Sequence, residues 1–109
     1  MSIKEIADLY NVKYVAVNPD QLPTVVFNKE NAPIIIEKLR FECKPLLGCD
    51  VYRIKNGAIT EVRLPNLYVD RNANESLTAF LQRSCNESLE FVTNYPQYTN
   101  DTFFDFVAM

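Results

Sequence analysis

The sequence contains no histidine and no tryptophan, and it has only two glycines in 109 residues. Without histidine the chain lacks the commonest general base, the base of most nucleophilic triads and the preferred nitrogen ligand of zinc. Two glycines provide neither a Walker loop nor a dinucleotide-binding turn. We therefore expect no catalytic residue, no metal site and no cofactor. The composition favours a protein that binds over an enzyme.

Long apolar runs are also absent from the chain. No stretch approaches the roughly 20 apolar residues of a membrane span, and the first ten residues carry charges where a signal peptide would be apolar. Three cysteines, without metal-ligand spacing, are typical of reduced and buried thiols. The net charge of −3 disfavours nucleic acid and favours a cationic partner. We therefore predict a cytoplasmic protein that binds neither membrane nor nucleic acid.

The residues that are present are those of an ordinary globular protein, with 48% hydrophobic and 23% charged side chains. The length predicts a single domain over residues 1–109. The strongest pattern is a helix within residues 74–95, with Asn74 as its N-cap and Pro96 beyond its end. Small or apolar residues recur there at steps of three and four, which predicts one buried stripe. The stripe consists of Leu77, Phe80, Leu81, Ser84, Cys85, Ser88, Leu89 and Val92.

Two more helices are predicted nearer the N-terminus. Ser2 and Glu5 form a capping-box pattern for a helix that continues to Tyr10. A second helix is predicted from a cap at Asn31 to Cys43. Residues 14–17 and 24–27 are short β-type runs, which we interpret as edge strands or extended connections, and residues 18–20 are a turn signal.

A hairpin is predicted at residues 49–64, where Asn56-Gly57 forms a two-residue turn. In that register Ile54 faces Ile59, Tyr52 faces Glu61 and Asp50 faces Arg63. The other predicted pairs are Arg53 with Thr60, Val51 with Val62 and Cys49 with Leu64. The final residues 103–107 carry large apolar side chains on both faces, which is typical of a central strand. These elements predict an α+β fold, an antiparallel sheet with helices packed on one face.

Several of these segments together resemble a family of bacterial immunity proteins, immunity protein 40, which accompanies polymorphic and contact-dependent growth-inhibition toxins. The resemblance rests on GCDVYRIKNG at 48–57, on Tyr68 and Asp70, on NESL and NYP in the long helix, and on the aromatic terminal strand. It covers residues 47–109 and leaves the first 46 unplaced. It implies a cytoplasmic protein that binds a cognate toxin domain, often a nuclease, and blocks it.

The resemblance is densest around four residues that we predict to bind the partner: Tyr52, Glu61, Tyr68 and Asp70. The carboxylates would face a basic cleft and the tyrosines would act as rigid anchors. The alternative interpretation makes Asp70 a cap or turn residue and Tyr68 a core ring. For the whole chain, the alternatives are a small-molecule-binding or enzymatic α+β domain with a pocket on the sheet face, or an adaptor in a larger assembly.

Overall fold

The computed structural model describes residues 1–19 and 23–109, and this part of the chain forms three helices and six strands. The helices are α1 (Ile3–Leu9), α2 (Ala32–Phe41) and α3 (Leu77–Thr93). The strands are β1 (Val15–Val17), β2 (Thr24–Val26), β3 (Leu46–Lys55), β4 (Ala58–Glu61), β5 (Leu67–Tyr68) and β6 (Thr102–Ala108). The turn predicted at residues 18–20 ends at Asp20, which lies outside the described residues.

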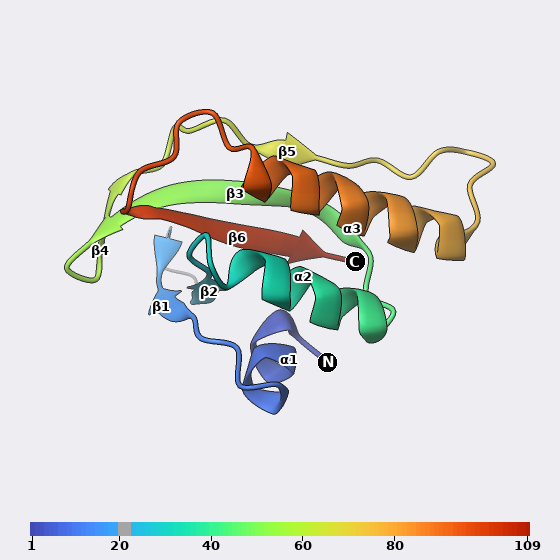
Figure 1. The fold of residues 1–109 in the computed structure, drawn as a ribbon, viewed down its shortest axis with the longest axis horizontal. Coiled ribbons are helices and arrows are strands. Elements are labelled where there is room, and N and C mark those ends of the chain that lie inside the picture. The colour runs from blue at the N-terminus through green and yellow to red at the C-terminus, as the bar shows by residue number, and fades with distance from the viewer. Residues whose placement is uncertain (20–22) are drawn as a thin grey trace.

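The ten-residue strand β3 is the centre of the main sheet. It pairs antiparallel with β4 and β5 along one edge and with β6 along the other (Figure 1). The outer edge of β6 is bridged at Phe104 to Phe27, which follows β2. The hairpin of β1 and β2 forms a separate two-stranded sheet. The prediction of an antiparallel sheet is confirmed, and both short N-terminal β runs are strands.

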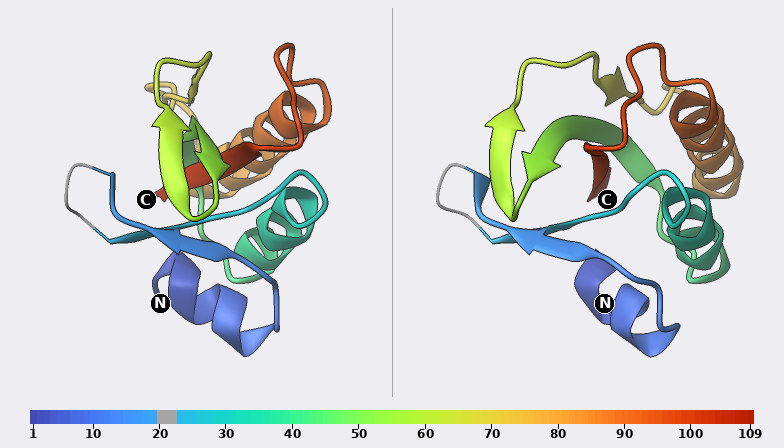
Figure 2. Two further views of the ribbon diagram at one scale, coloured as in Figure 1. Left: turned by 90° about the vertical axis from the view of Figure 1, so that its left-hand side faces the viewer. Right: turned by 60° about the vertical axis from the view of Figure 1, so that its left-hand side comes forward.

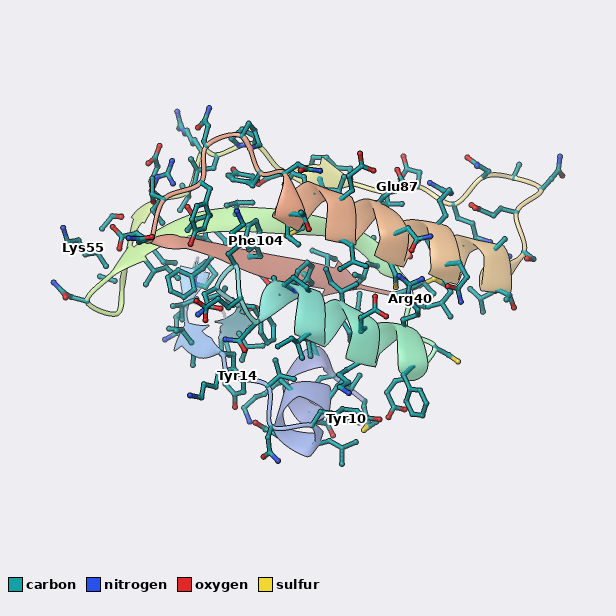
Figure 3. All side chains as sticks on the ribbon, viewed as in Figure 1. Tyr10, Tyr14, Arg40, Lys55, Glu87 and Phe104 are labelled. Carbon is teal, nitrogen blue, oxygen red and sulfur yellow. The ribbon has the colours of Figure 1, made fainter. Side chains whose placement is uncertain are left out.

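Helices α2 and α3 lie side by side on one face of the main sheet, as predicted (Figure 2). The core between the layers joins Val51 and Phe104 from the sheet to apolar side chains of both helices. Phe104 lies fully buried in this core, between the sheet and the helices (Figure 3). Arg40 of α2 joins the helices at the surface, because its guanidinium donates to the Asn86 side chain of α3 at 2.8 Å. The α+β class with helices on one face is confirmed.

All three predicted helices exist, and one of their three predicted N-cap positions is wrong. Ser2 and Glu5 form the predicted capping box of α1. Helix α3 is capped by Ser76 instead of Asn74, and the Ser76 Oγ accepts from the backbone N–H of Ala79 at 3.1 Å. The later start leaves Leu77 in the first helical position, 48% exposed, so it does not belong to the buried stripe.

Helix α2 begins as predicted, with Asn31 at its N-cap position, but it ends before the predicted Cys43. Asn31 makes no capping hydrogen bond with its side chain. Its backbone N–H instead donates to the Asn28 side chain at 2.9 Å, because the chain turns before the helix rather than at its first residue. The helix ends at Phe41, and Cys43 adopts a left-handed φ of 56° beyond it. Cys43 is therefore exposed, whereas a buried thiol was expected.

The hairpin turn is confirmed and most of its predicted register is wrong. Asn56 and Gly57 have positive φ values of 53° and 79°, and Ile54 pairs with Ile59. A bulge then shifts the register, so that Glu61 pairs with Arg53 instead of Tyr52. One extra residue in a strand reverses which face the following side chains occupy. Because β4 ends at Glu61, the pairs predicted beyond it, Asp50 with Arg63 among them, do not form.

Candidate partner-binding surface

The main sheet has a second face, opposite α2 and α3, that is covered only in part. Side chains alternate across a strand, and Cys49 and Val51 of β3 belong to the helix-covered core. Asp50 and Tyr52 therefore point to the other side. Cross-strand pairing adds neighbours from β5 and β6 to the same side. We call this surface the open face, formed by Asp50, Tyr52, Tyr68, Asp105 and Val107.

Gly48 lies in the middle of the open face, between Tyr68 of β5 and Val107 of β6. A Cβ atom at this position would come within 2.4 Å of the backbone oxygen of Leu67. Only glycine permits this close approach of two strands. Tyr68 and Val107 remain 79% and 42% exposed, and the open face thus has apolar surface on both sides of Gly48.

Two carboxylates meet directly across the strands of the open face. Asp50 of β3 pairs with Asp105 of β6, an arrangement that brings Cβ atoms to about 5 Å and disfavours like charges. Asp105 accepts a hydrogen bond from the Thr24 hydroxyl at 3.1 Å. Burial is the main cause that raises the Asp105 pKa to about 6, the Asp50 charge adds to it, and hydrogen bonds from Thr24 and Tyr52 oppose it. In the described part of the chain, the Asp50 side chain has neither a hydrogen bond nor an ion pair.

A groove of about 490 Å³ opens beside this carboxylate pair. Its described lining combines amide, carboxylate and phenol groups with apolar side chains: Asn18, Pro19, Asp50, Tyr52, Ile59, Val62 and Asn66. The hairpin of β1 and β2 covers the sheet on one side of it, where Val17 and Val26 pack on Ile54. The groove is therefore bounded by that hairpin and by the connection between β4 and β5.

The structure brings two of the four predicted partner-binding residues onto the open face. Tyr68 is too exposed to be a core ring, and Tyr52 is half-buried in the lining of the groove. Glu61 lies apart from them, because the bulge directs it to the opposite face. There its carboxylate binds the Arg53 guanidinium with an Nε–Oε2 distance of 3.0 Å. Asp70 is exposed just beyond β5.

An ion-pair network holds the connection between β5 and α3 against the helix. The Arg83 Nε lies 2.7 Å from a Glu75 carboxylate oxygen, and Arg83 also binds Glu87 and the backbone oxygen of Asp70. The hydrogen bond from Arg83 is the largest cause that lowers the Glu75 pKa to about 2. This network gives a fixed position to the segment that follows Tyr68.

The carboxylate pair was not predicted, since the predicted hairpin register paired Asp50 with Arg63. Nothing in the local pattern shows that β6 pairs with β3. The one available signal was a single acidic residue, Asp105, in an otherwise apolar terminal strand. A charge at such a position is uncommon unless it is paired or has a function.

Other chemically reactive groups do not converge on this surface. Burial raises the pKa of the Cys49 and Cys85 thiols, which belong to the core, while Cys43 is exposed just beyond the end of α2. Among residues 1–19 and 23–109, no three histidine, cysteine or acidic side chains are grouped as metal ligands would be. None of the helices in the described chain is long and apolar enough to cross a membrane.

The main sheet thus has helices on one face, and on the other an exposed tyrosine beside two partly buried carboxylates. The sequence model of the family described as Immunity protein 40 matches residues 16–108, and the chain belongs to this family. The match extends the resemblance, which was limited to residues 47–109, through β1, β2 and α2. No curated protein and no solved structure matched the chain.

Proposed function

We propose that this protein is a stoichiometric inhibitor that binds a cognate bacterial toxin domain and blocks it. The observation that carries the proposal is the match to a family of immunity proteins over nearly the whole chain. The toxin would belong to a polymorphic or contact-dependent growth-inhibition system. A nuclease is the toxin class that fits best, because a surface that grips phosphates is cationic. The net charge of −3 and the acidic open face complement such a surface.

The proposed contact surface includes three of the four predicted residues. Tyr68 is the strongest candidate, because a large aromatic side chain on an ordered strand is 79% exposed. Rigid, amphipathic rings of this kind supply much of the binding energy in protein interfaces. Tyr52 lies on the same face, and Asp70 lies at its edge. Glu61 contributes less in this proposal, since Arg53 already neutralises its carboxylate.

A second candidate function is a small-molecule-binding or enzymatic domain that uses the groove on the open face. The groove volume and the raised Asp105 pKa favour this alternative. However, only one tyrosine is part of the described groove lining, whereas this alternative would require a pocket lined by several tyrosines. A lone carboxyl group could act as a general acid or base but needs a positioned substrate. We therefore rank this function below toxin binding.

Co-expression tests the proposal directly. The toxin domain encoded immediately upstream of this chain would be expressed with and without it, and bacterial growth would be followed. The wild-type chain should restore growth, and Tyr68→Ala should raise the dissociation rate of the purified complex by about tenfold or more. Phe41→Ala is the matched control, since Phe41 is a 75% exposed aromatic residue on α2. No rescue by the folded wild-type chain would contradict the proposed function.

A further inference from the structure

We infer that the open face receives a basic segment of the toxin, with one arginine side chain entering the groove between Asp50 and Tyr52. This inference rests on the proposed function and deepens it, because it assigns the docking face and the chemistry of the contact. Three features of the molecule carry it: a sheet face that is covered only in part, a groove of suitable lining and a negative charge that the described residues leave uncompensated.

The negative charge of the open face comes from two neighbouring carboxylates. Asp50 and Asp105 stand opposite each other on neighbouring strands, where two like charges cost stability. Each of the five ion pairs in the described chain joins other carboxylates to lysine or arginine. Among the described residues, the Asp105 carboxylate has only the Thr24 and Tyr52 hydroxyls as donors, and Asp50 has no donor. A cation supplied by a partner would remove this repulsion.

The shape of the site selects the kind of cation. The groove of about 490 Å³ beside Asp50 has apolar walls from Ile59 and Val62 and an aromatic ring from Tyr52. An arginine has a long apolar stem and a planar group that stacks on rings and binds carboxylates in pairs. A lysine ammonium is a compact, strongly hydrated charge and gains less from such walls.

The rest of the open face provides the surrounding contact area. Val107 and Tyr68 are exposed on either side of Gly48, where no side chain stands out from the sheet. A toxin segment could therefore lie along β3 with its arginine in the groove and its apolar residues on Val107 and Tyr68. This combination of a charged contact and a neighbouring aromatic anchor is common at the centre of tight interfaces.

The test measures binding and stability on the same variants. The purified toxin domain encoded upstream is titrated with wild type, Asp50→Asn, Asp105→Asn and the control Glu90→Gln, in a buffer with a chelator. Glu90 is an exposed carboxylate on the outer side of α3. Both aspartate variants should weaken Kd by about tenfold or more, whereas the control should stay within about twofold. The Tm of both aspartate variants should equal or exceed that of wild type.

The stability readout separates a docking role from a structural one. Aspartate variants that bind as tightly as wild type would overturn the inference and leave the proposed function standing. Weaker binding together with a lower Tm would also overturn it, because these carboxylates would then support the fold. A wild-type chain that does not bind the toxin domain would contradict the proposed function itself, and this inference with it. Arginine-to-alanine variants of the toxin should include one that loses the same affinity and shows no further loss with Asp50→Asn.

Discussion

Ser84 and Ser88 of α3 should respond very differently to the same substitution, although both are fully buried. The Ser84 Oγ accepts a hydrogen bond from the backbone N–H of Leu46 at 3.1 Å, where the pairing of β3 with β6 changes register. In the described part of the chain, the Ser88 Oγ donates only to the Ser84 carbonyl at 2.8 Å, one helical turn away. Ser84 therefore joins the helix to the sheet, and Ser88 bonds within its own helix.

The magnitudes follow from what each substitution leaves behind. Ser84→Ala leaves the buried Leu46 N–H without an acceptor, which costs about 1–3 kcal/mol. The higher helix propensity of alanine returns up to about 0.5 kcal/mol. Ser88→Ala leaves no buried donor without an acceptor. The Ser84 carbonyl that loses the hydroxyl also accepts the ordinary backbone hydrogen bond of the helix. We expect Ser88→Ala to change the free energy of unfolding by no more than about 0.5 kcal/mol in either direction.

Urea denaturation and thermal melting of the two variants measure this difference. A gap of about 1.5 kcal/mol corresponds to a Tm difference of roughly 6 °C for a domain of this size. Equal midpoints for Ser84→Ala and Ser88→Ala would refute the reasoning, because the contact between Ser84 and Leu46 would then contribute nothing to stability.

Three further predictions concern the sheet and the thiols. The contribution of Asp105 to stability should fall as pH rises from about 4 to about 6, because the folded state keeps Asp105 protonated after the unfolded state has ionised. Asp105→Asn should therefore become more stable than wild type across this range, by about 1–2 kcal/mol at pH 7 after allowance for solvent screening. A difference between the two proteins that stays constant with pH in urea titrations would contradict this. Gly48→Ala should lower Tm by more than about 8 °C, since the new methyl group meets the Leu67 oxygen, and a small Tm change would refute that reading. A thiol reagent should modify Cys43 rapidly in the folded protein and all three cysteines in denaturant, whereas fast native labelling of the other two would show that they are not buried.

The sequence predicted features that depend on neighbouring residues. The stripe of α3, the capping box at Ser2 and the turn at Asn56-Gly57 each follow from chemistry within a few positions. The structure confirms the capping box, the turn and most of the stripe, in which Leu77 is exposed and Leu89 is half-buried. The α+β class followed from the order of these elements. The cap of α3 was assigned two residues early, because Asn74 and Ser76 are both good caps and only the tertiary structure selects one.

The contact surface depends on which strands pair with each other, and the local sequence pattern does not show this pairing. A bulge places Glu61 on the sheet face opposite the open face, and no residue in the hairpin predicts this bulge strongly. Asp50 and Asp105 lie at distant positions in the chain, so their meeting requires knowledge of which strands pair. For Tyr68 the sequence left an exposed anchor and a core ring open, and the structure shows the exposed ring; its position on the same face as Tyr52 depends on the pairing of β5 with β3.

The most direct test of the central claim is the stoichiometry of protection. The purified chain is added to its toxin domain at increasing ratios, while calorimetry records binding and a parallel assay records residual toxicity. A stoichiometric inhibitor should bind one to one, with a Kd of about 1 nM or tighter, and protection should be complete only near equal concentrations. Full protection at a small fraction of the toxin concentration would show catalytic inactivation, and the absence of binding would show that the toxin is not the partner. Either result would contradict the account.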